Sequence, residues 1–331
     1  MRSYPLGLTP NHLPPPLSHC RENNAGGLHG NSALNVGYSC LMPQLLSLWR
    51  REWSKEPGTT DPLFPFGLVT LSTADSEGAG DIGSFRFAQT ASYGVVPNPV
   101  MANAWTAHAY DLADPWIFCE GSPPTKTCPG CDTIDPRYNC SAPSEGPGIH
   151  PRLKVPVGQR LAHGALVTAY GFPGPVTGPT ISGCTVTNSS LTVTFAVNGG
   201  AMYVKDNGGG PAFSGFSALV GATAEAGSGQ WVPLNISQVG ATSAISVDVS
   251  PLAGQPVSAI KYAWGATGGA PNGDDVTCCV SMPSKECLPA QCPIFVGSPM
   301  APYGGLPANP FLAQISPAGK CVCTAPQACD A

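Results

Sequence analysis

The stretch Ile149-His150-Pro151-Arg152-Leu153-Lys154, followed by the run from Val155 to Tyr170, organises this chain. A histidine just ahead of a proline, on a loop that leads directly into a helix, is well placed to point its imidazole into a cleft. The apolar spacing that follows predicts an amphipathic helix packed on a sheet. The residues expected on its buried face are Leu161, Ala165, Leu166 and Ala169, with Gln159, Arg160 and His163 pointing elsewhere. His150 is therefore a candidate general base, although a histidine before a helix is more often a surface residue or a cap.

The composition indicates a loop-rich globular protein. Its 331 residues, 42% of them hydrophobic, are enough for two domains with their own cores. The 40 glycines and 37 prolines favour many turns. No apolar run approaches the length of about 18 residues that a membrane span needs. A net charge of −5, with 11% charged residues, gives no basic surface for nucleic acid. We therefore expect neither membrane insertion nor nucleic-acid binding.

The 14 cysteines point to an oxidising compartment, where disulfides persist. Zinc is the alternative, because Cys128-Pro-Gly-Cys131 has ligand spacing, but no second pair follows at the spacing of a zinc ribbon. Sequons agree with secretion, and they lie at Asn139-Cys-Ser141, Asn188-Ser-Ser190 and Asn235-Ile-Ser237. The Pro-rich segment from Met1 to His19 lacks the apolar core of a signal peptide. We expect a secreted, disulfide-bonded glycoprotein with no metal.

The first half of the chain reads as part of an α/β layer. Residues 1–19 are expected to be disordered, because closely spaced prolines prevent a helix. An amphipathic helix of about four turns is predicted from Tyr38 to Trp53, with Arg50, Arg51 and Glu52 outside its apolar stripe. Phe64 to Leu71 is a short apolar run typical of a strand buried on both faces. Ala102 to Leu112 resembles a further strand or a helix end.

After residue 172 the pattern changes to that of antiparallel strands. Ile181 to Val197 alternates with a period of two, which predicts a half-buried strand. Further short strands are predicted at Gln230 to Ile236, Ala244 to Val249 and Val257 to Trp264, and this spacing favours a small β-sandwich. The tail, Thr277 to Ala331, is rich in Cys and Pro and is expected to lie over that sandwich.

A set of short motifs occurs in the order found in sialate O-acetylesterases of the animal type, and the chain resembles that family from about Cys20 to Ile315. The motifs are Tyr38-Ser-Cys40-Leu-Met-Pro43, Trp49-Arg50, Phe64-Pro-Phe-Gly-Leu-Val69, Gln89-Thr90, Tyr93-Gly-Val-Val-Pro-Asn-Pro99, Asp111-Leu112, Ile149-His-Pro-Arg152, Tyr262-Ala-Trp264 and Gln291-Cys-Pro-Ile294. The resemblance implies a secreted or lysosomal carboxylic ester hydrolase that removes acetyl groups from the hydroxyls of sialic acids, with no cofactor.

The resemblance also implies a fold class. We expect an incomplete three-layer α/β domain of the SGNH type at residues 20–172, with a Cys-rich insertion at 115–147. A β-sandwich with a disulfide-rich tail is expected at 173–331. The substrate partner would be an O-acetylated sialic acid or sialoglycan.

The candidate site residues follow from the same resemblance. His150 matches the family's base, and ester hydrolysis also needs a serine nucleophile, an orienting carboxylate and oxyanion donors. Asp111 or Asp114 is expected to supply the carboxylate, with Asp111 favoured because Asp111-Leu112 matches the family. The alternative for each is a cap or a solvated loop. Glu22-Asn23-Asn24 resembles the remnant of a Gln-Gly-Glu-x-Asn block, so Asn24 and Glu22 are candidates for oxyanion and substrate contacts, with a surface loop as the alternative.

The chain departs from the family at the nucleophile. The family carries its serine in a Gly-Gln-Ser-Asn block ahead of the Gln-Gly-Glu block, and this sequence contains no such block. Gly30-Asn31-Ser32 is only superficially similar and lies after Glu22. We therefore expect that residues 1–19 replace the N-terminal half and that the chain is inactive alone. Two other hypotheses are a secreted glycan-binding or structural remnant and a zinc module at Cys119 to Cys140.

Overall fold

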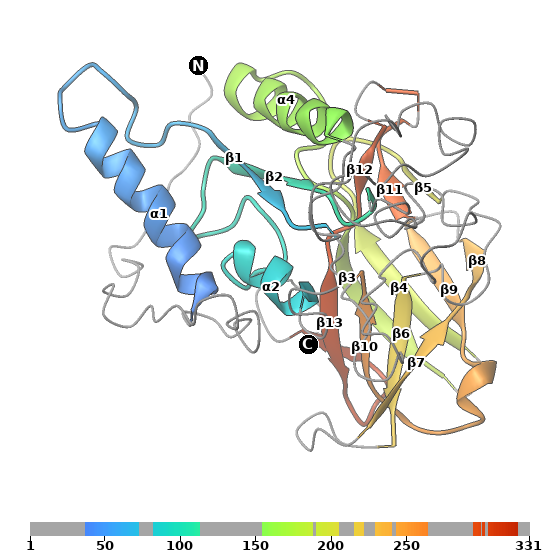
Figure 1. Cartoon of the computed structure of the whole chain (residues 1–331). Coiled ribbons are helices and arrows are strands. Elements are labelled where there is room, and N and C mark those ends of the chain that lie inside the picture. Colours follow the sequence, from blue (N-terminus) through green and yellow to red (C-terminus); the bar gives the residue numbers. More distant parts are fainter. Residues whose placement is uncertain are drawn as a thin grey trace, which may run out of the picture.

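The computed structural model describes residues 37–72, 82–112, 154–187, 190–204, 215–221, 229–239, 243–263, 294–298, 300–301 and 304–323. Helices and strands of the first part are α1 (Tyr38–Trp53), β1 (Phe66–Thr70), α2 (Ile82–Gln89), β2 (Ala104–His108) and α4 (Val155–Tyr170). Strands of the second part are β3 (Thr180–Val186), β4 (Ser190–Ala196), β5 (Met202–Val204), β6 (Phe216–Val220), β7 (Gln230–Leu234), β8 (Ile236–Val239), β9 (Ala244–Asp248), β10 (Val257–Tyr262), β11 (Ile294–Val296), β12 (Leu306–Pro307), β13 (Phe311–Ile315) and β14 (Cys321–Cys323), with one 3₁₀ turn, η4 (Ser250–Leu252). Figure 1 shows the helical part beside the strands.

Strands β1 and β2 form a parallel pair, with Thr70 opposite His108 at their carboxyl ends. The predicted strand within residues 64–71 is confirmed, and the ambiguous stretch 102–112 contains strand β2. Helix α4 lies along one side of the pair, and α1 and α2 lie on the other (Figure 1). Leu46 of α1 shares a hydrophobic cluster with Leu68 of β1. Apolar side chains thus hold a helix, sheet and helix layer together.

The predicted buried face of α4 is wrong. Its buried residues are Arg160 and Gly164. Of the residues expected there, Leu161 and Ala165 are half-buried, and Leu166 and Ala169 are exposed. The cause lies in β2, where the ring of Trp105 rises toward the helix. A Cβ at position 164 would lie 2.0 Å from Cδ1 of Trp105, so only glycine lets the helix settle on the indole.

Helix α1 is confirmed, but Arg50 is buried rather than outside the apolar stripe. Its Nη2 donates to the carbonyl oxygens of Phe64 at 2.8 Å and Asn103 at 3.2 Å. The guanidinium therefore satisfies backbone acceptors in the loops that precede both strands. Those bonds compensate the desolvation of a charge that the helical pattern had placed in water.

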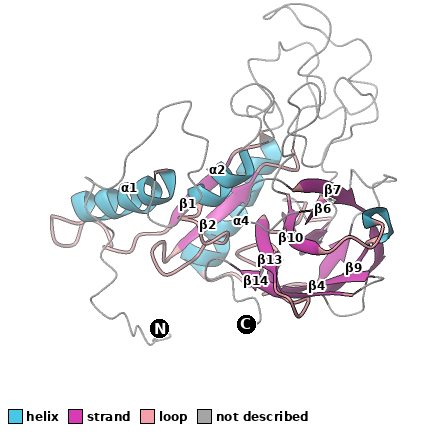
Figure 2. Cartoon of the chain, turned by 90° about the horizontal axis from the view of Figure 1, so that it is seen from below, coloured by secondary structure: helices cyan, strands magenta, loops and turns pink. Residues whose placement is uncertain are grey.

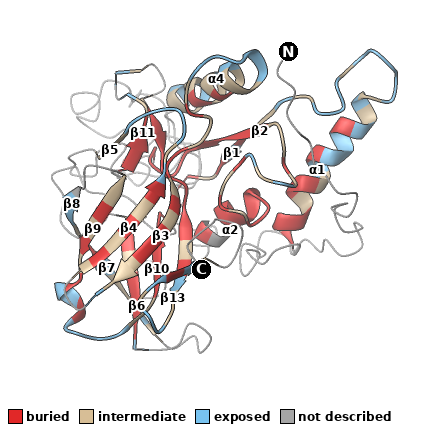
Figure 3. Ribbon diagram, turned by 180° about the vertical axis from the view of Figure 1, so that it is seen from behind, coloured by how far each residue is buried: buried red, intermediate tan, exposed pale blue. Residues whose placement is uncertain are grey.

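The second part consists of antiparallel sheets around one core. A five-stranded sheet has the order β14-β13-β10-β6-β7, a four-stranded sheet has the order β3-β4-β9-β8, and a three-stranded sheet has the order β12-β11-β5. Phe195 of the four-stranded sheet and Phe216, Tyr262 and Phe311 of the five-stranded sheet belong to one buried cluster. Figure 2 shows the two larger sheets facing each other, and Figure 3 shows buried residues along their strands. This is the packing expected of a β-sandwich.

Two strand predictions in this part need correction. Residues 181–197 form a hairpin of β3 and β4 rather than one strand, closed where Thr187 N donates to Ser190 O at 2.8 Å. Residues 230–236 reach into two strands, because the chain leaves the five-stranded sheet after β7 and enters the four-stranded sheet at β8. The alternation hides both breaks, because strands on either side of each break pack on the same core.

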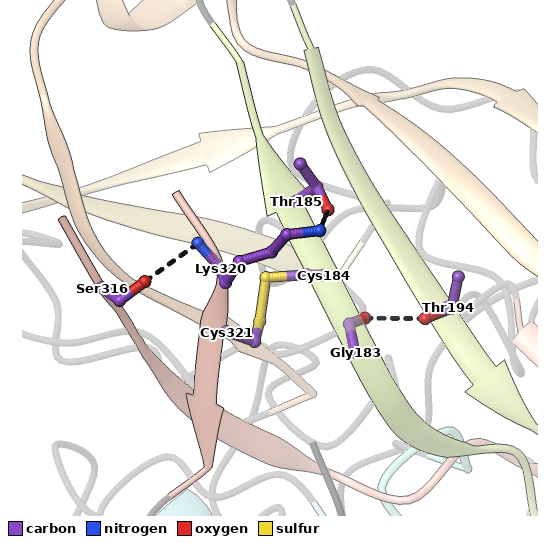
Figure 4. Close-up of a disulfide and its surroundings, with 7 residues drawn as sticks. All are labelled: Gly183, Cys184, Thr185, Thr194, Ser316, Lys320 and Cys321. Carbon is purple, nitrogen blue, oxygen red and sulfur yellow. Dashed lines mark hydrogen bonds between the residues drawn. A yellow bond between two sulfur atoms is a disulfide. The ribbon is translucent and has the colours of Figure 1, made fainter. Parts of the chain in front are cut away.

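The described part of the tail is built into the sheets rather than laid over them. Strands β13 and β14 extend the five-stranded sheet, and β11 and β12 belong to the three-stranded sheet. A disulfide between Cys184 of β3 and Cys321 of β14 joins the two larger sheets across 137 residues of sequence (Figure 4). Beside it, Lys320 Nζ donates to Thr185 Oγ1 at 2.9 Å.

All four cysteines among the described residues are disulfide-bonded, since Cys40 and Cys323 are bonded as well. The expectation of disulfides is therefore confirmed. The predicted disordered segment 1–19, the Cys-rich insertion 115–147 and the candidate zinc module at Cys119 to Cys140 lie outside the described residues. The domain boundary between residues 172 and 173 stays a prediction.

Candidate active site

Polar side chains gather at the carboxyl ends of β1 and β2, which is the edge where α/β sheets bind ligands. Thr70 is the last residue of β1, and His108 is the last residue of β2. Asp111 follows three residues later. All three are buried, with exposed fractions of 0%, 3% and 1%. Buried polar groups must find partners within the protein, so their bonds define this region.

His108 is bonded through both ring nitrogens. Its Nδ1 lies 2.8 Å from Thr70 Oγ1, and its Nε2 lies 2.9 Å from Asn309 Oδ1. The amide nitrogen of Asn309 donates to Gly178 O at 2.9 Å and to Thr180 Oγ1 at 2.7 Å, which leaves its carbonyl oxygen facing the ring. Nε2 of His108 therefore carries the hydrogen, and Nδ1 accepts from the threonine hydroxyl.

Burial also sets the charge of this imidazole. The pKa of His108 is lowered to about 4, chiefly by desolvation; the bond to Asn309 and the carboxylate of Asp111 oppose this shift, and the Arg160 and Arg86 guanidinium groups contribute to it. The ring is therefore neutral near pH 7.

The order of hydroxyl, imidazole and amide in this chain of bonds is that of a nucleophile, a base and an orienting group. A substrate cannot reach Thr70, however, because its side chain is fully buried. Asn309 lies between β12 and β13, so the bonds tie the parallel pair to the sandwich. The Tyr110 hydroxyl adds to this junction by donating to the carbonyl of Ala308. We therefore interpret the hydrogen bonds from Thr70 through His108 to Asn309 as structural, because they hold the parallel pair against the sandwich.

Asp111 forms a two-pronged ion pair with Arg160 of α4. Nη1 of Arg160 donates to Oδ1 and Nη2 donates to Oδ2, each at 2.6 Å, and Nη1 also reaches the carbonyl of His108 at 2.6 Å. The side chains are 2% exposed for Arg160 and 0% exposed for Asp111. Parallel N–H···O bonds of this kind fix geometry as well as charge. The pair therefore fastens the first turns of α4 to the carboxyl end of β2.

Trp105 fixes the rest of α4 on the sheet. Its Nε1 donates to the carbonyl of Leu161 at 3.0 Å, and its ring fills the space beside Gly164. Gly67 of β1 is also close to this ring, because a Cβ there would lie 2.7 Å from Cε2 of Trp105. Two glycines and one indole thus set how closely the helix approaches the strands. His150 precedes this anchored helix in the sequence.

Of the predicted site residues, the structure describes Asp111. His150, Asp114, Glu22 and Asn24 lie outside the described residues, so their meeting with Asp111 stays a prediction. Each carboxylate oxygen of Asp111 keeps a further lone pair that can accept a hydrogen bond. Both oxygens already accept a hydrogen bond from Arg160, however, and the carboxylate has no exposed surface.

The sequence reasoning missed four residues of this region, which are Thr70, His108, Arg160 and Asn309. One signal was present, since Thr70 lies near the end of the predicted strand at residues 64–71, and α/β sheets place polar groups at strand ends. His108 lies inside the stretch 102–112, which the sequence left as a strand or a helix end. Arg160 was assigned to the polar face of its helix. Asn309 is far from the other three in sequence, and nothing local indicates its role.

The described part of the chain contains no group of three or more His, Cys, Asp or Glu side chains that could hold a metal ion. No helix there is both long and apolar enough to cross a membrane.

The chain is similar to curated sialate O-acetylesterases. It is 29% identical over 290 residues to the Mus musculus protein, covering 85% of this chain and 42% of that one. It is 34% identical over 172 residues to the Homo sapiens protein, covering 49% of this chain and 28% of that one. No protein-family model matches the sequence.

A solved structure has a similar fold. The crystal structure of a carbohydrate acetylesterase from Xanthomonas citri matches with a TM-score of 0.50 and 20% identity, over 83% of this chain and 45% of that one. The chain thus spans less than half the length of these relatives. In its ordered motifs and over most of its length this chain resembles the sialate O-acetylesterases, and its fold resembles that of the carbohydrate acetylesterase.

Proposed function

We propose that this chain is part of a carboxylic ester hydrolase that removes O-acetyl groups from sialic acids. The observation that carries the proposal is the similarity to the Mus musculus sialate O-acetylesterase over 85% of the chain. The anchored helix behind His150 supports it, because a catalytic base needs a rigid support. We place the protein in a secreted or lysosomal compartment, where its disulfides would persist.

The proposed chemistry is acyl transfer through a serine. The serine hydroxyl gives its proton to His150 and attacks the acetyl carbonyl, and amide donors hold the negative oxygen. When the intermediate collapses, the protonated imidazole returns the proton to the departing sugar hydroxyl. Water then attacks the acetyl-enzyme with His150 again as base, and acetate leaves. Asn24 would serve as an oxyanion donor, with Glu22 beside it on the substrate.

The serine is proposed to come from a segment with the Gly-Gln-Ser-Asn block, because this sequence contains none. For the acid that orients His150, the ion pair of Asp111 with Arg160 favours Asp114. Asp111 would then act as a positioning residue, since it holds the helix that follows the base. This assignment separates two aspartates that the sequence left as alternatives.

Acetate release from an O-acetylated sialoglycoprotein tests the proposal. The full chain would be assayed alone and together with a separately produced family segment that contains the Gly-Gln-Ser-Asn block. We expect hydrolysis in the mixture, a loss of at least a hundredfold with His150→Ala, and a loss of about tenfold to a hundredfold with Asp114→Asn. Acetate release that survives His150→Ala unchanged would remove the base from the mechanism and refute the proposal.

A further inference from the structure

One side of the sandwich is closed by bonds between its two larger sheets. The terminal strands on that side are β3 of the four-stranded sheet and β14 of the five-stranded sheet. The disulfide between Cys184 and Cys321 joins these strands, and beside it Lys320 pairs with Thr185 through an isolated bridge and a side-chain bond of 2.9 Å (Figure 4). Neither edge is therefore free to separate from the other.

The opposite side of the sandwich has no such closure, and we call it the open side. Its terminal strands are β7, which pairs with β6, and β8, which pairs with β9. Neither β7 nor β8 contains a cysteine, and within the described residues no ladder joins them. The chain itself makes the crossing, at Asn235 between the two strands. Figure 1 shows β8 on the side of the molecule away from α1 and α2.

The two strand edges of the open side differ in their protection. An exposed edge presents unpaired backbone groups to other chains, and charges, prolines, bulges or short length reduce that hazard. Strand β7 contains Pro233, which is exposed and has no N–H to donate. Strand β8 contains neither a charged residue nor a proline. Its protection is its short length and a register shift between Ile236 and Gln238, so β8 is the less protected edge.

The crossing between β7 and β8 begins the sequon Asn235-Ile-Ser237, which lies wholly within the described residues. Leu234 is fully buried, and Ile236 packs against the same core. Alternate residues of an extended chain point to opposite sides, so the side chain of Asn235 is directed outward. Asn235 itself is half-buried and Ser237 is exposed. Both polar members of the motif therefore lie at the surface beside the β8 edge.

The side-chain amide of Asn235 is not used by the fold. Nδ2 of Asn98 donates to two backbone carbonyls, and Nδ2 of Asn309 donates to three acceptors, so those amides hold the structure together. Asn235 differs, because within the described residues its side chain forms no hydrogen bond. Its backbone oxygen accepts from Asp248 N at 2.8 Å, which fixes the crossing without the side chain. A sugar on Nδ2 of Asn235 would thus break no bond of the fold.

We propose that Asn235 is an N-glycosylation site and that its glycan shields the β8 edge on the open side. The inference rests on the proposed secretory location, because the donor is a lipid-linked oligosaccharide pyrophosphate of that compartment. Nδ2 of Asn235 loses a proton and forms a bond to the anomeric carbon of the donor sugar. The bond from that carbon to the pyrophosphate oxygen breaks, and its electron pair leaves with the lipid pyrophosphate.

Occupancy of the site tests the first half of the inference. The full chain is secreted from cultured eukaryotic cells behind a cleavable signal peptide. Its peptides are then treated with peptide N-glycosidase in heavy-oxygen water, which converts each glycosylated asparagine to a labelled aspartate. Ser237→Ala destroys the sequon, and the matched control Ser237→Thr preserves it at the same exposed position. We expect label at Asn235 in the wild-type and Ser237→Thr chains and its loss in Ser237→Ala.

Self-association tests the second half, and light scattering of the purified variants measures it. We expect stronger association of Ser237→Ala than of Ser237→Thr, because the β8 edge is then uncovered. Adding Gln238→Lys to Ser237→Ala places a charge on that edge and should abolish the increase. The matched control is Gln314→Lys, also added to Ser237→Ala. Its charge lies at an exposed position of β13, which is paired on both sides, so the increase should remain.

Each result decides one half of the inference. A wild-type chain without label at Asn235 overturns the site. Equal association of Ser237→Ala and Ser237→Thr overturns the shielding role, as do equal effects of the two lysine changes. Trimming the wild-type glycan with an endoglycosidase should raise association in the same way, and this measurement needs no substitution. Because the signal peptide supplies the compartment and acetate release is not measured, failure of the proposed esterase function would leave these results unchanged.

Discussion

Removing the charge of Asp111 tests the ion pair that fastens α4 to the sheet. Asp111→Asn keeps the shape of the side chain and one carbonyl oxygen for Nη1 of Arg160, which is 2.6 Å away in the native pair. It turns the second oxygen, also at 2.6 Å, into an amide donor that faces Nη2. The guanidinium would then remain buried without a counter-charge.

The size of the effect follows from burial. Removing one partner of a buried ion pair costs about 3–5 kcal/mol, because the remaining charge is left without compensation. Since the asparagine retains one acceptor, we expect a loss in the free energy of unfolding at the lower end, about 3 kcal/mol. With a urea dependence of about 3 kcal/mol per molar, the midpoint of unfolding would fall by about 1 M.

Urea unfolding followed by tryptophan fluorescence measures this change, and the chain supplies a matched control. Glu52→Gln disrupts an exposed pair of Glu52 with Arg51, and it should leave the midpoint unchanged. Adding Arg160→Met to Asp111→Asn should restore part of the loss, because the unpaired charge is then removed. A midpoint for Asp111→Asn equal to that of Glu52→Gln would refute the positioning role. Normal stability with lost acetate release would instead return Asp111 to the catalytic role.

Three further predictions use thermal or urea unfolding. Gly164→Ala should lower the free energy of unfolding by about 1–3 kcal/mol, because its new Cβ would lie 2.0 Å from the indole beneath it. Gly158→Ala on the same helix meets nothing within 4 Å and should raise it by about 0.5–1 kcal/mol, and equal effects of the two changes would contradict the packing described. His108 has a pKa of about 4 when folded and about 6.5 when unfolded, so the unfolded chain protonates first. Stability should therefore decline by about 3 kcal/mol as the pH falls from about 6.5 to about 4, and this decline should be absent in His108→Gln. Replacing Cys184 and Cys321 together by alanine should cost about 2–5 kcal/mol through the freed loop, and an unchanged unfolding temperature would show that other links suffice.

The sequence by itself determined the main elements and the resemblance to a family. The apolar runs at Tyr38–Trp53, Phe66–Thr70 and Val155–Tyr170 have the periods of a helix, a buried strand and a helix, and each forms as its period predicts. The change to alternation near residue 180 predicted antiparallel strands. The order of short motifs indicated the family without any contact being known. These features are local or ordered along the chain, so a single sequence can contain them.

The tertiary structure alone decided which faces are buried and which polar groups meet. Arg160 is buried because Asp111 lies opposite it, and Gly164 is buried because Trp105 rises beneath it, although the helical pattern favoured the other side. His108 is bonded to Asn309, 201 residues away in sequence. The buried face of an amphipathic helix can be chosen by a charge pair or a close backbone approach as well as by apolar area. Those partners come from distant segments, which only folding brings together.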